Sequence, residues 1–157
     1  MINQANARGE FLMMAVPVAD NTGVGPISGE PLLFGLIAGN SDDDSIASDN
    51  FGLAGVAQNS YTPPTGIPNP EGVGVQFIGV FFLSVTALDG LSPASGRALA
   101  PGDRVYADGG TYDATTGCTY GFTLNADFVE GVYFGNVLDA VPAGTTATVR
   151  VRLKVGG

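Results

Sequence analysis

Carboxylates are the only side chains suited to catalysis that this chain offers in number. The sequence has no histidine, so the Ser-His-Asp and Cys-His arrangements and the usual proton shuttle are absent. Glycoside hydrolysis needs only two carboxylates, and the available set is Asp103, Asp108, Asp113, Glu130 and Asp139. All but Glu130 lie in Asp-Gly, Gly-Asp or Asp-Ala settings, where aspartate commonly bonds the backbone of its own turn. We therefore predict that the protein is not an enzyme.

An acidic, serine-rich segment, residues 40–50, has part of the spacing of a calcium loop. Asn40, Asp42 and Asp44 alternate as the first ligands of such a loop do. The sixth position is Ser45 where the loop needs glycine, and the twelfth is Phe51 where it needs a bidentate glutamate. We expect a solvated acidic loop here.

Two further features could bind or react, and neither has its required neighbours. The glycine-rich residues 23–29 are not followed by the Lys and the Ser or Thr of a phosphate-binding loop. Cys118 has no adjacent basic residue that would lower its pKa. We expect no cofactor.

Half of the positive charge of the chain lies on one face of one predicted strand. Residues 146–155 alternate without interruption, which predicts a strand of an antiparallel sheet with one buried and one wet face. The wet face carries Arg150, Arg152 and Lys154, three of only six basic residues. This basic stripe is either a solvated surface or a contact to acidic groups on a neighbouring subunit or shell.

Residues 1–10 are polar and without periodicity, and they lead directly into an apolar stretch at Phe11. We interpret them as an extended N-terminal arm that docks on a partner. The predicted partner-binding residues are those of the arm and of the basic stripe: Ile2, Asn3, Gln4, Asn6, Arg8, Arg150, Arg152 and Lys154.

Composition favours one all-β domain over residues 11–157. The chain has 157 residues, 45% hydrophobic and 13% charged, with 24 glycines and 10 prolines. Many short strands joined by Gly/Pro turns are typical of such a composition, so we expect a single antiparallel sandwich or small barrel of about eight to ten strands. The expected strands are 11–18, 31–38, 51–57, 73–87 with a kink at Gly79, 101–106, 120–124 and 146–155.

Turn chemistry separates these strands. Asp108-Gly109 is the strongest signal for a two-residue hairpin, and Thr116-Gly117 is a second candidate. Residues 59–72 contain four prolines and two glycines and predict a long surface excursion.

Charge and hydropathy exclude some partners. The net charge of −9 is repelled by a phosphate backbone, so we expect no nucleic-acid binding. The longest strongly apolar run, 77–83, is far shorter than the ~20 residues that span a bilayer, and the first residues lack the regions of a signal peptide. With one cysteine, the chain fits a protein made in a reducing cytoplasm and not bound to membrane.

Three segments in the C-terminal half share an order and spacing with a known family. They are residues 101–106, 131–138 and 143–153, and their pattern resembles that of the capsid decoration (cement) proteins of tailed bacteriophages, a family formerly described only as a domain of unknown function. Earlier segments fall in the order expected of that family: Gly9 with the strand 11–18, residues 29–35, 55–57 and 77–81.

The resemblance implies a structural virion protein. Such a protein is made in the host cytoplasm, binds the outer surface of the assembled head, commonly as a homotrimer, and stabilises contacts between major capsid protein subunits. The alternative from another class is a glycan-binding β module on a virion or cell surface. Glycan sites favour exposed aromatic platforms, whereas this chain has no tryptophan and its five tyrosines are scattered along the sequence.

Overall fold

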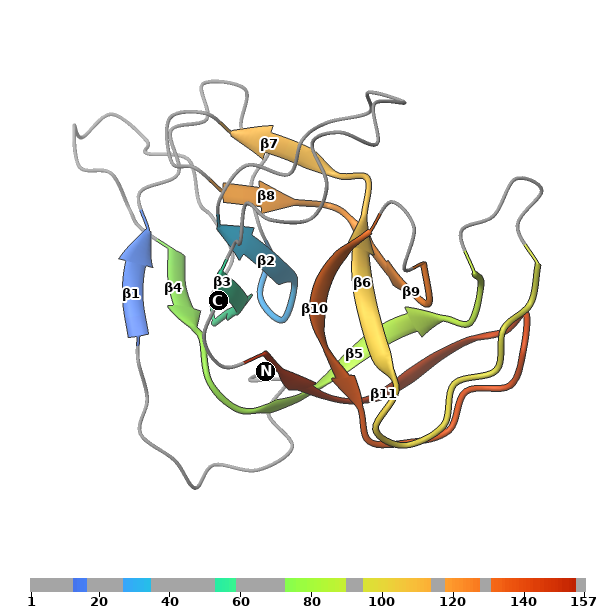
Figure 1. The fold of residues 1–157 in the computed structure, drawn as a ribbon. Helices are drawn as coiled ribbons and strands as arrows, with labels where there is room; N and C mark the ends of the chain where they lie inside the picture. The colour runs from blue at the N-terminus through green and yellow to red at the C-terminus, as the bar shows by residue number, and fades with distance from the viewer. Residues whose placement is uncertain are drawn as a thin grey trace.

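The computed structural model describes residues 13–16, 27–34, 53–58, 73–89, 95–113, 118–127 and 131–154. Within these ranges the chain forms eleven β-strands and no helix (Figure 1). The prediction of an all-β chain is confirmed. The predicted arm, residues 1–10, and the segments 40–50 and 59–72 lie outside the described ranges.

Five strands close into a small barrel. They are β5 (Val80–Thr86), β6 (Arg104–Asp108), β9 (Thr123–Asn125), β10 (Val132–Val137) and β11 (Thr146–Leu153), in the order β10-β11-β5-β9-β6. Every neighbouring pair for which a register is given is antiparallel, except β5 and β9, which run parallel. The longest ladder joins β11 to β5 over seven residue pairs.

The remaining strands form a six-stranded antiparallel sheet beside the barrel (Figure 1). They are β1 (Met13–Val16), β2 (Pro31–Phe34), β3 (Leu53–Ala57), β4 (Val73–Gln76), β7 (Thr111–Asp113) and β8 (Cys118–Tyr120), in the order β1-β4-β3-β2-β8-β7. The fold thus contains a small barrel, as expected, together with a second sheet that packs against it.

The chain crosses between sheet and barrel three times, and glycine stands at each crossing. Gly79 separates β4 from β5 with a φ of 142°, and Gly121 separates β8 from β9 with a φ of 69°. Each therefore divides one of the expected strands, 73–87 and 120–124, into two strands of different sheets. At Gly109 and Gly110, with φ of 72° and 94°, the chain passes from β6 to β7. Positive φ is inexpensive only for glycine, which explains the positions of these divisions.

The predicted hairpin at Asp108-Gly109 is wrong. β6 pairs with β9 and β10 in the barrel, whereas β7 pairs with β8 in the other sheet. The turn chemistry was identified correctly, but the turn carries the chain out of one sheet into another. At the second candidate, Thr116-Gly117, the flanking strands β7 and β8 do pair antiparallel. The two turn residues themselves lie outside the described ranges.

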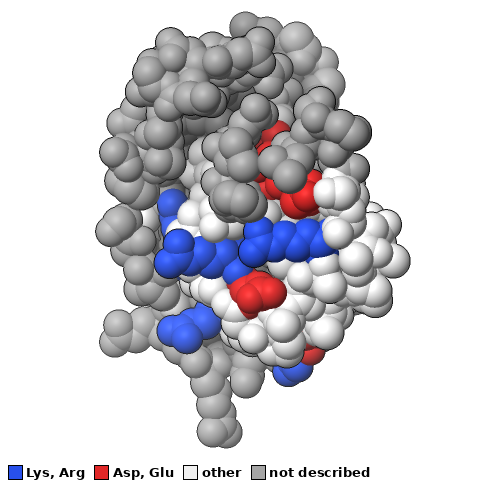
Figure 2. Space-filling view, turned by 45° about the vertical axis from the view of Figure 1, so that its right-hand side comes forward, with Lys and Arg blue, Asp and Glu red and all other residues white. Residues whose placement is uncertain are grey.

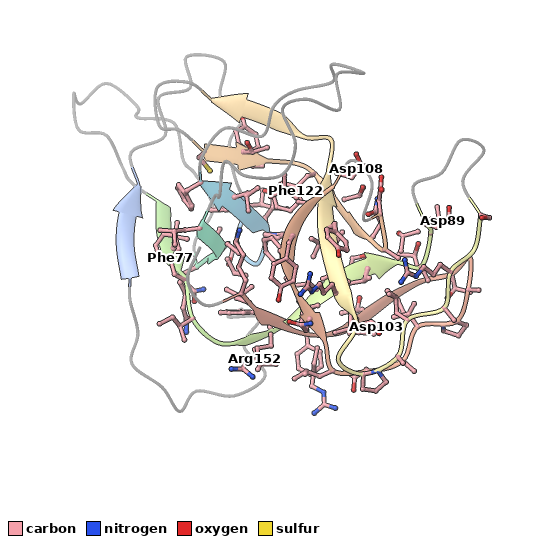
Figure 3. The ribbon with its side chains drawn as sticks, in the orientation of Figure 1. Phe77, Asp89, Asp103, Asp108, Phe122 and Arg152 are labelled. Carbon is pink, nitrogen blue, oxygen red and sulfur yellow. The ribbon has the colours of Figure 1, made fainter. Side chains whose placement is uncertain are left out.

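Two apolar clusters hold the fold together. The larger one fills the barrel and includes Phe81, Phe134 and Val151, none of which is exposed. Leu33 and Val56 of the six-stranded sheet belong to the same cluster, so sheet and barrel share a core. Phe122, located where sheet and barrel meet, packs edge-on against Phe134 with ring centroids 5.7 Å apart (Figure 3).

The second cluster lies on the other face of the six-stranded sheet, around Leu32, Val75 and Phe77 (Figure 3). Leu32 and Leu33 are adjacent and both are buried, because strand side chains alternate between faces and both faces of β2 are covered. β2 is therefore an interior strand with no solvent-facing side at these two residues.

Closure of the barrel depends on a close approach of β10 and β11 at Gly135. A Cβ built on Gly135 would collide with the backbone carbonyl of Arg152 and lie 3.3 Å from the Cα of Leu153. The register between β10 and β6 also shifts between Tyr133 and Gly135, which marks a β-bulge or irregularity. Glycine is required here because the neighbouring atoms are backbone and cannot rotate away.

We expect Gly135→Ala to lower the free energy of unfolding by at least about 2 kcal/mol, since the added methyl group must push two ladder strands apart. Thr148→Ala is the control, because Thr148 is an exposed residue of β11 in the same barrel. It should change stability by no more than about 0.5 kcal/mol. Urea unfolding followed by circular dichroism measures both. Equal midpoints for the two variants would show that the barrel does not depend on this approach.

Candidate functional site

The structure corrects the composition of the basic stripe. Arg150 and Arg152 are exposed on the outer side of β11, as predicted, but Lys154 is buried, with 9% of its surface exposed. The strand ends at Leu153, and the backbone N–H of Lys154 donates to the carbonyl oxygen of Phe134 at 3.0 Å. The alternation of faces therefore stops at Leu153, two residues before the sequence pattern does. Burial lowers the pKa of the Lys154 ammonium.

Arg150 is exposed, but its guanidinium is already engaged within the chain. It pairs with Asp139 in the turn between β10 and β11, with Nη2 2.5 Å from Oδ1 and Nε within 3.1 Å of both carboxylate oxygens. The backbone N–H of Arg150 also donates to Asp139 Oδ2 at 2.9 Å. These hydrogen bonds lower the pKa of Asp139 from 3.8 to about 2. Arg150 therefore fixes a turn, and of the predicted stripe only Arg152 is exposed without this engagement.

A different arrangement of polar side chains crosses the outer side of the barrel. The Cα of Asn136 on β10 is the register partner of Arg104 on β6 and of Arg152 on β11. We call Arg104, Asn136 and Arg152 the arginine row. Adjacent strands lie about 4.8 Å apart, so the two arginine Cα atoms are at most about 10 Å from one another. Both arginines are exposed, and Arg152 projects away from the barrel interior (Figure 3).

Neighbouring side chains hold this row in place. The Tyr133 hydroxyl donates to Asn136 Oδ1 at 2.6 Å, and Asn136 Nδ2 donates to the carbonyl oxygen of Gly102 at 2.8 Å. The Arg104 guanidinium carbon lies 5.2 Å from the centre of the Tyr133 ring, a cation–π geometry. Tyr106 packs edge-on against Tyr133 with centroids 6.1 Å apart. Tyrosine and arginine are the residues that most often dominate protein–protein contacts.

The sequence pattern alone missed Arg104, Tyr106 and Tyr133. Arg104 and Tyr106 are two residues apart in a strand, so they share a face. The sequence therefore contained the signal that places these two side chains together. Their proximity to Tyr133 and Arg152 depends on barrel pairing across many residues and had no local signal. Two of the tyrosines that are scattered in sequence are thus neighbours in space.

Basic side chains gather on one described face of the molecule. In the view of Figure 2, they form a band across the described surface, with acidic side chains next to it. Basic residues are scarce in this chain, 6 against 15 acidic ones.

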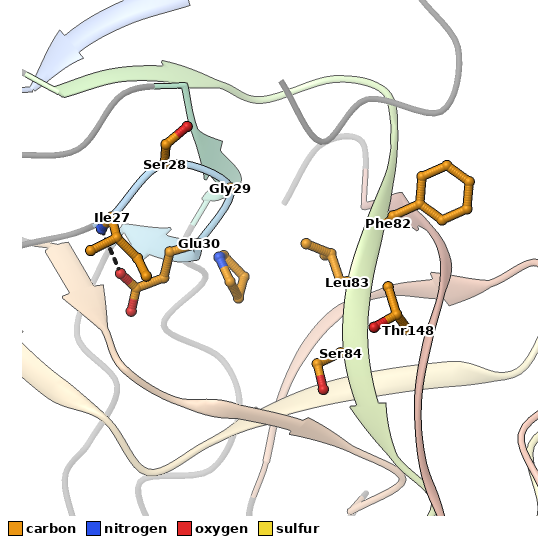
Figure 4. A pocket seen from close by; sticks show the side chains of 9 residues that line it. Ile27, Ser28, Gly29, Glu30, Phe82, Leu83, Ser84 and Thr148 are labelled. Atoms are coloured by element: carbon orange, nitrogen blue, oxygen red, sulfur yellow. Dashed lines mark hydrogen bonds between the residues drawn. The ribbon is translucent and has the colours of Figure 1, made fainter. Parts of the chain in front are cut away.

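An open depression of about 510 Å³ lies between residues 27–31 and strands β5 and β11 (Figure 4). Its acidic group, Glu30, is occupied by the fold: Oε2 accepts the backbone N–H of Ile27 and Oε1 accepts that of Gly121, both at 2.8 Å. Glu30 thereby ties the turn before β2 to the turn between β8 and β9. The depression has no pair of carboxylates among its lining residues.

The described carboxylates of the catalytic set serve separate turns. Asp103 accepts the backbone N–H of Ala100 at 2.8 Å, and Asp108 accepts the Asn125 amide at 3.1 Å. These two aspartates lie at opposite ends of β6 (Figure 3). Asp139 pairs with Arg150, as described above. The side chains of Asp113 and Glu130 lie outside the described part of the structure.

The remaining candidate sites are the calcium-like segment, the arm and Cys118. Asn40, Asp42 and Asp44, and the arm residues Ile2, Asn3, Gln4, Asn6 and Arg8, lie outside the described ranges. Within those ranges no three His, Cys, Asp or Glu side chains are grouped to hold a metal. Cys118 is buried in the second apolar cluster. The described residues also include no helix long and apolar enough to cross a membrane.

No protein-family model, curated protein or solved structure matches the chain. The fold and the surface define the class by themselves: an all-β protein, built from a barrel and an attached sheet, whose candidate binding surface is the arginine row on the outer side of the barrel.

We expect the Asp139 carboxyl to titrate with a midpoint near 2, and Arg150→Gln to return it toward 3.8. Because the folded pKa is lowered, the stabilisation is fully present above pH 3.8 and is lost as the pH falls through about 2. Carboxyl-carbon NMR measures the midpoint. Arg152→Gln is the matched control and should leave it unchanged; an equal shift in both variants would point to general charge and not to this pair.

Lys154 should make stability rise with pH below 10.5. Its folded pKa is lowered by burial, so between that value and 10.5 the unfolded chain binds more protons than the folded one. Lys154→Met should remove this rise, measured as the difference between variant and wild-type unfolding curves across alkaline pH. A pH-independent difference would contradict a lowered pKa.

Proposed function

We propose that the protein is a structural virion protein that binds the outer surface of the assembled head of a tailed bacteriophage and stabilises contacts between major capsid protein subunits. Its partners are the major capsid protein and further copies of itself in a homotrimer. It acts on the outer surface of the virion after synthesis in the host cytoplasm, and it performs no chemistry.

The observation that carries this proposal is the placement of the segments that resemble the decoration family. Residues 101–106 lead into β6, residues 131–138 contain β10, and residues 143–153 contain β11. These three strands are neighbours in the barrel, in the order β6, β10, β11 around its wall. A pattern that is weak in each segment therefore corresponds to one continuous part of the fold.

The same segments are bonded to one another at their turns. The N–H of Gly102 donates to the carbonyl of Val137 at 2.7 Å, and the N–H of Val137 donates to that of Asp103 at 3.0 Å. The N–H of Leu138 donates to the carbonyl of Arg150 at 2.7 Å. The turn at residues 101–103 is thus hydrogen-bonded to the end of β10, and the residue that follows β10 is hydrogen-bonded to β11. A rigid β surface of this kind binds a partner with little loss of conformational entropy.

The arm provides the test. An extended segment of ten residues reaches at most about 33 Å, and it can add a strand to an exposed sheet edge through main-chain hydrogen bonds. Deleting residues 1–9 should leave the thermal midpoint of the isolated protein unchanged, because the segment is polar. The same deletion should lower occupancy on purified heads at least about tenfold, or 1.4 kcal/mol.

Head binding is measured by competition between full-length and truncated protein, with occupancy read by cryo-electron microscopy or quantitative gel analysis. Equal occupancy would reject the arm as the docking element. Failure of the full-length protein to bind heads at all would reject the proposed function.

A glycan-binding module is the second candidate, and one observation favours it. Tyr106 and Tyr133 lie side by side on the outer side of the barrel, next to the amide of Asn136, and aromatic rings beside amide groups are common in sugar sites. Binding on a glycan array that Tyr133→Ala abolishes, together with no binding to heads, would favour this candidate over the first.

A further inference from the structure

Within the arginine row, the Arg104 guanidinium is held in place by its neighbours. The Arg104 guanidinium is stacked at 5.2 Å on Tyr133, the hydroxyl of Tyr133 is bonded to Asn136, and the amide of Asn136 is bonded to Gly102. Each group is thus held by the next and finally by the backbone. A guanidinium fixed in this way loses less side-chain entropy on binding than a free arginine.

Carboxylates are the groups that this row fits. Within the described ranges neither Arg104 nor Arg152 forms an ion pair with an acidic side chain, in contrast to Arg150 and Asp139. Guanidinium binds carboxylate with two parallel hydrogen bonds, which gives geometric specificity as well as attraction. Nucleic-acid phosphate would fit the same groups, but nucleic-acid binding needs many clustered lysines and arginines, and the chain has only 6 basic residues.

The charge of the chain points to a second copy as the occupant. The chain has 15 acidic residues against 6 basic ones, so a second copy supplies carboxylates in excess over competing cations. Repulsion between two chains of −9 acts at long range and is screened over about 8 Å at physiological ionic strength. Direct pairs of guanidinium and carboxylate are closer than that and are retained.

The sign of the charge also restricts the contact. A contact in which the row of one copy faced the row of another would set arginine against arginine, which is unfavourable. The row must therefore meet a different, acidic part of the next copy.

We propose that Arg104 and Arg152, which flank Asn136 of β10, bind carboxylates of a second copy of this chain. This proposal rests on the self-association that forms part of the proposed function, and it names the surface and the chemistry that would mediate it. Tyr133 and Asn136 act as positioning residues for Arg104.

The experiment is sedimentation equilibrium of the full chain over a range of concentrations, with four proteins compared. The double variant Arg104→Gln with Arg152→Gln should weaken self-association at least about a hundredfold, tenfold for each lost pair. Tyr133→Leu should weaken it about tenfold, because it removes the ring on which Arg104 is stacked. Arg97→Gln is the matched control, because Arg97 is exposed but lies in the segment between β5 and β6, off the row. It should self-associate as the wild type does.

Each result decides the matter. A wild type that stays monomeric throughout, a double variant that self-associates like wild type, or an Arg97→Gln effect equal to that of the double variant overturns the proposal. Circular dichroism melts confirm that the variants are folded, and an unfolded double variant is replaced by the single variants, which are read by the same criterion.

Binding to heads is measured separately, so the two ideas fail separately. A wild type that is monomeric but decorates heads rejects the arginine-row contact and leaves the proposed function intact. A wild type that associates through the row but does not bind heads rejects the proposed function and retains the contact.

Discussion

The pairing of the barrel strands depends on a close approach of β10 and β11 at Gly135. No Cβ fits there, because the carbonyl of Arg152 occupies the space. β10 can therefore pair with β6 on one side and β11 on the other. Asn136 follows directly and turns outward between Arg104 and Arg152. The arrangement of the outer surface is thus a result of how the interior closes.

Local patterns in the sequence predicted local structure well. The alternation in residues 148–153 reports a strand with one buried face because period two is imposed by the pleat, and Val149, Val151 and Leu153 are buried accordingly. The failure at Lys154 has an equally physical origin. Alternation predicts the face of a residue only while the ladder continues, and the ladder ends at Leu153.

Long-range pairing was not accessible in the same way. Asp108-Gly109 has the chemistry of a tight turn, but the identity of the strands that the turn joins depends on partners 15 or more residues away, such as the pairing of Asp108 with Thr123. The candidate surface changed for the same reason. Sequence placed three basic residues along one strand, whereas pairing assembled two arginines from strands almost fifty positions apart in the chain, around an asparagine that the sequence did not single out.

The strands β7 and β8 have a consequence for how the molecule can come apart. The chain leaves the barrel after β6, adds two strands to the other sheet, and returns as β9, which lies between β5 and β6 and runs parallel to β5. Neither sheet is a continuous piece of chain, so neither can be cut out and expected to fold alone. A force that pulls the six-stranded sheet away from the barrel acts on both ends of the β7–β8 insertion. One end is joined to β6 and the other to β9, so the load is shared between these two covalent connections. The molecule should yield in one cooperative step, as a single mechanical unit.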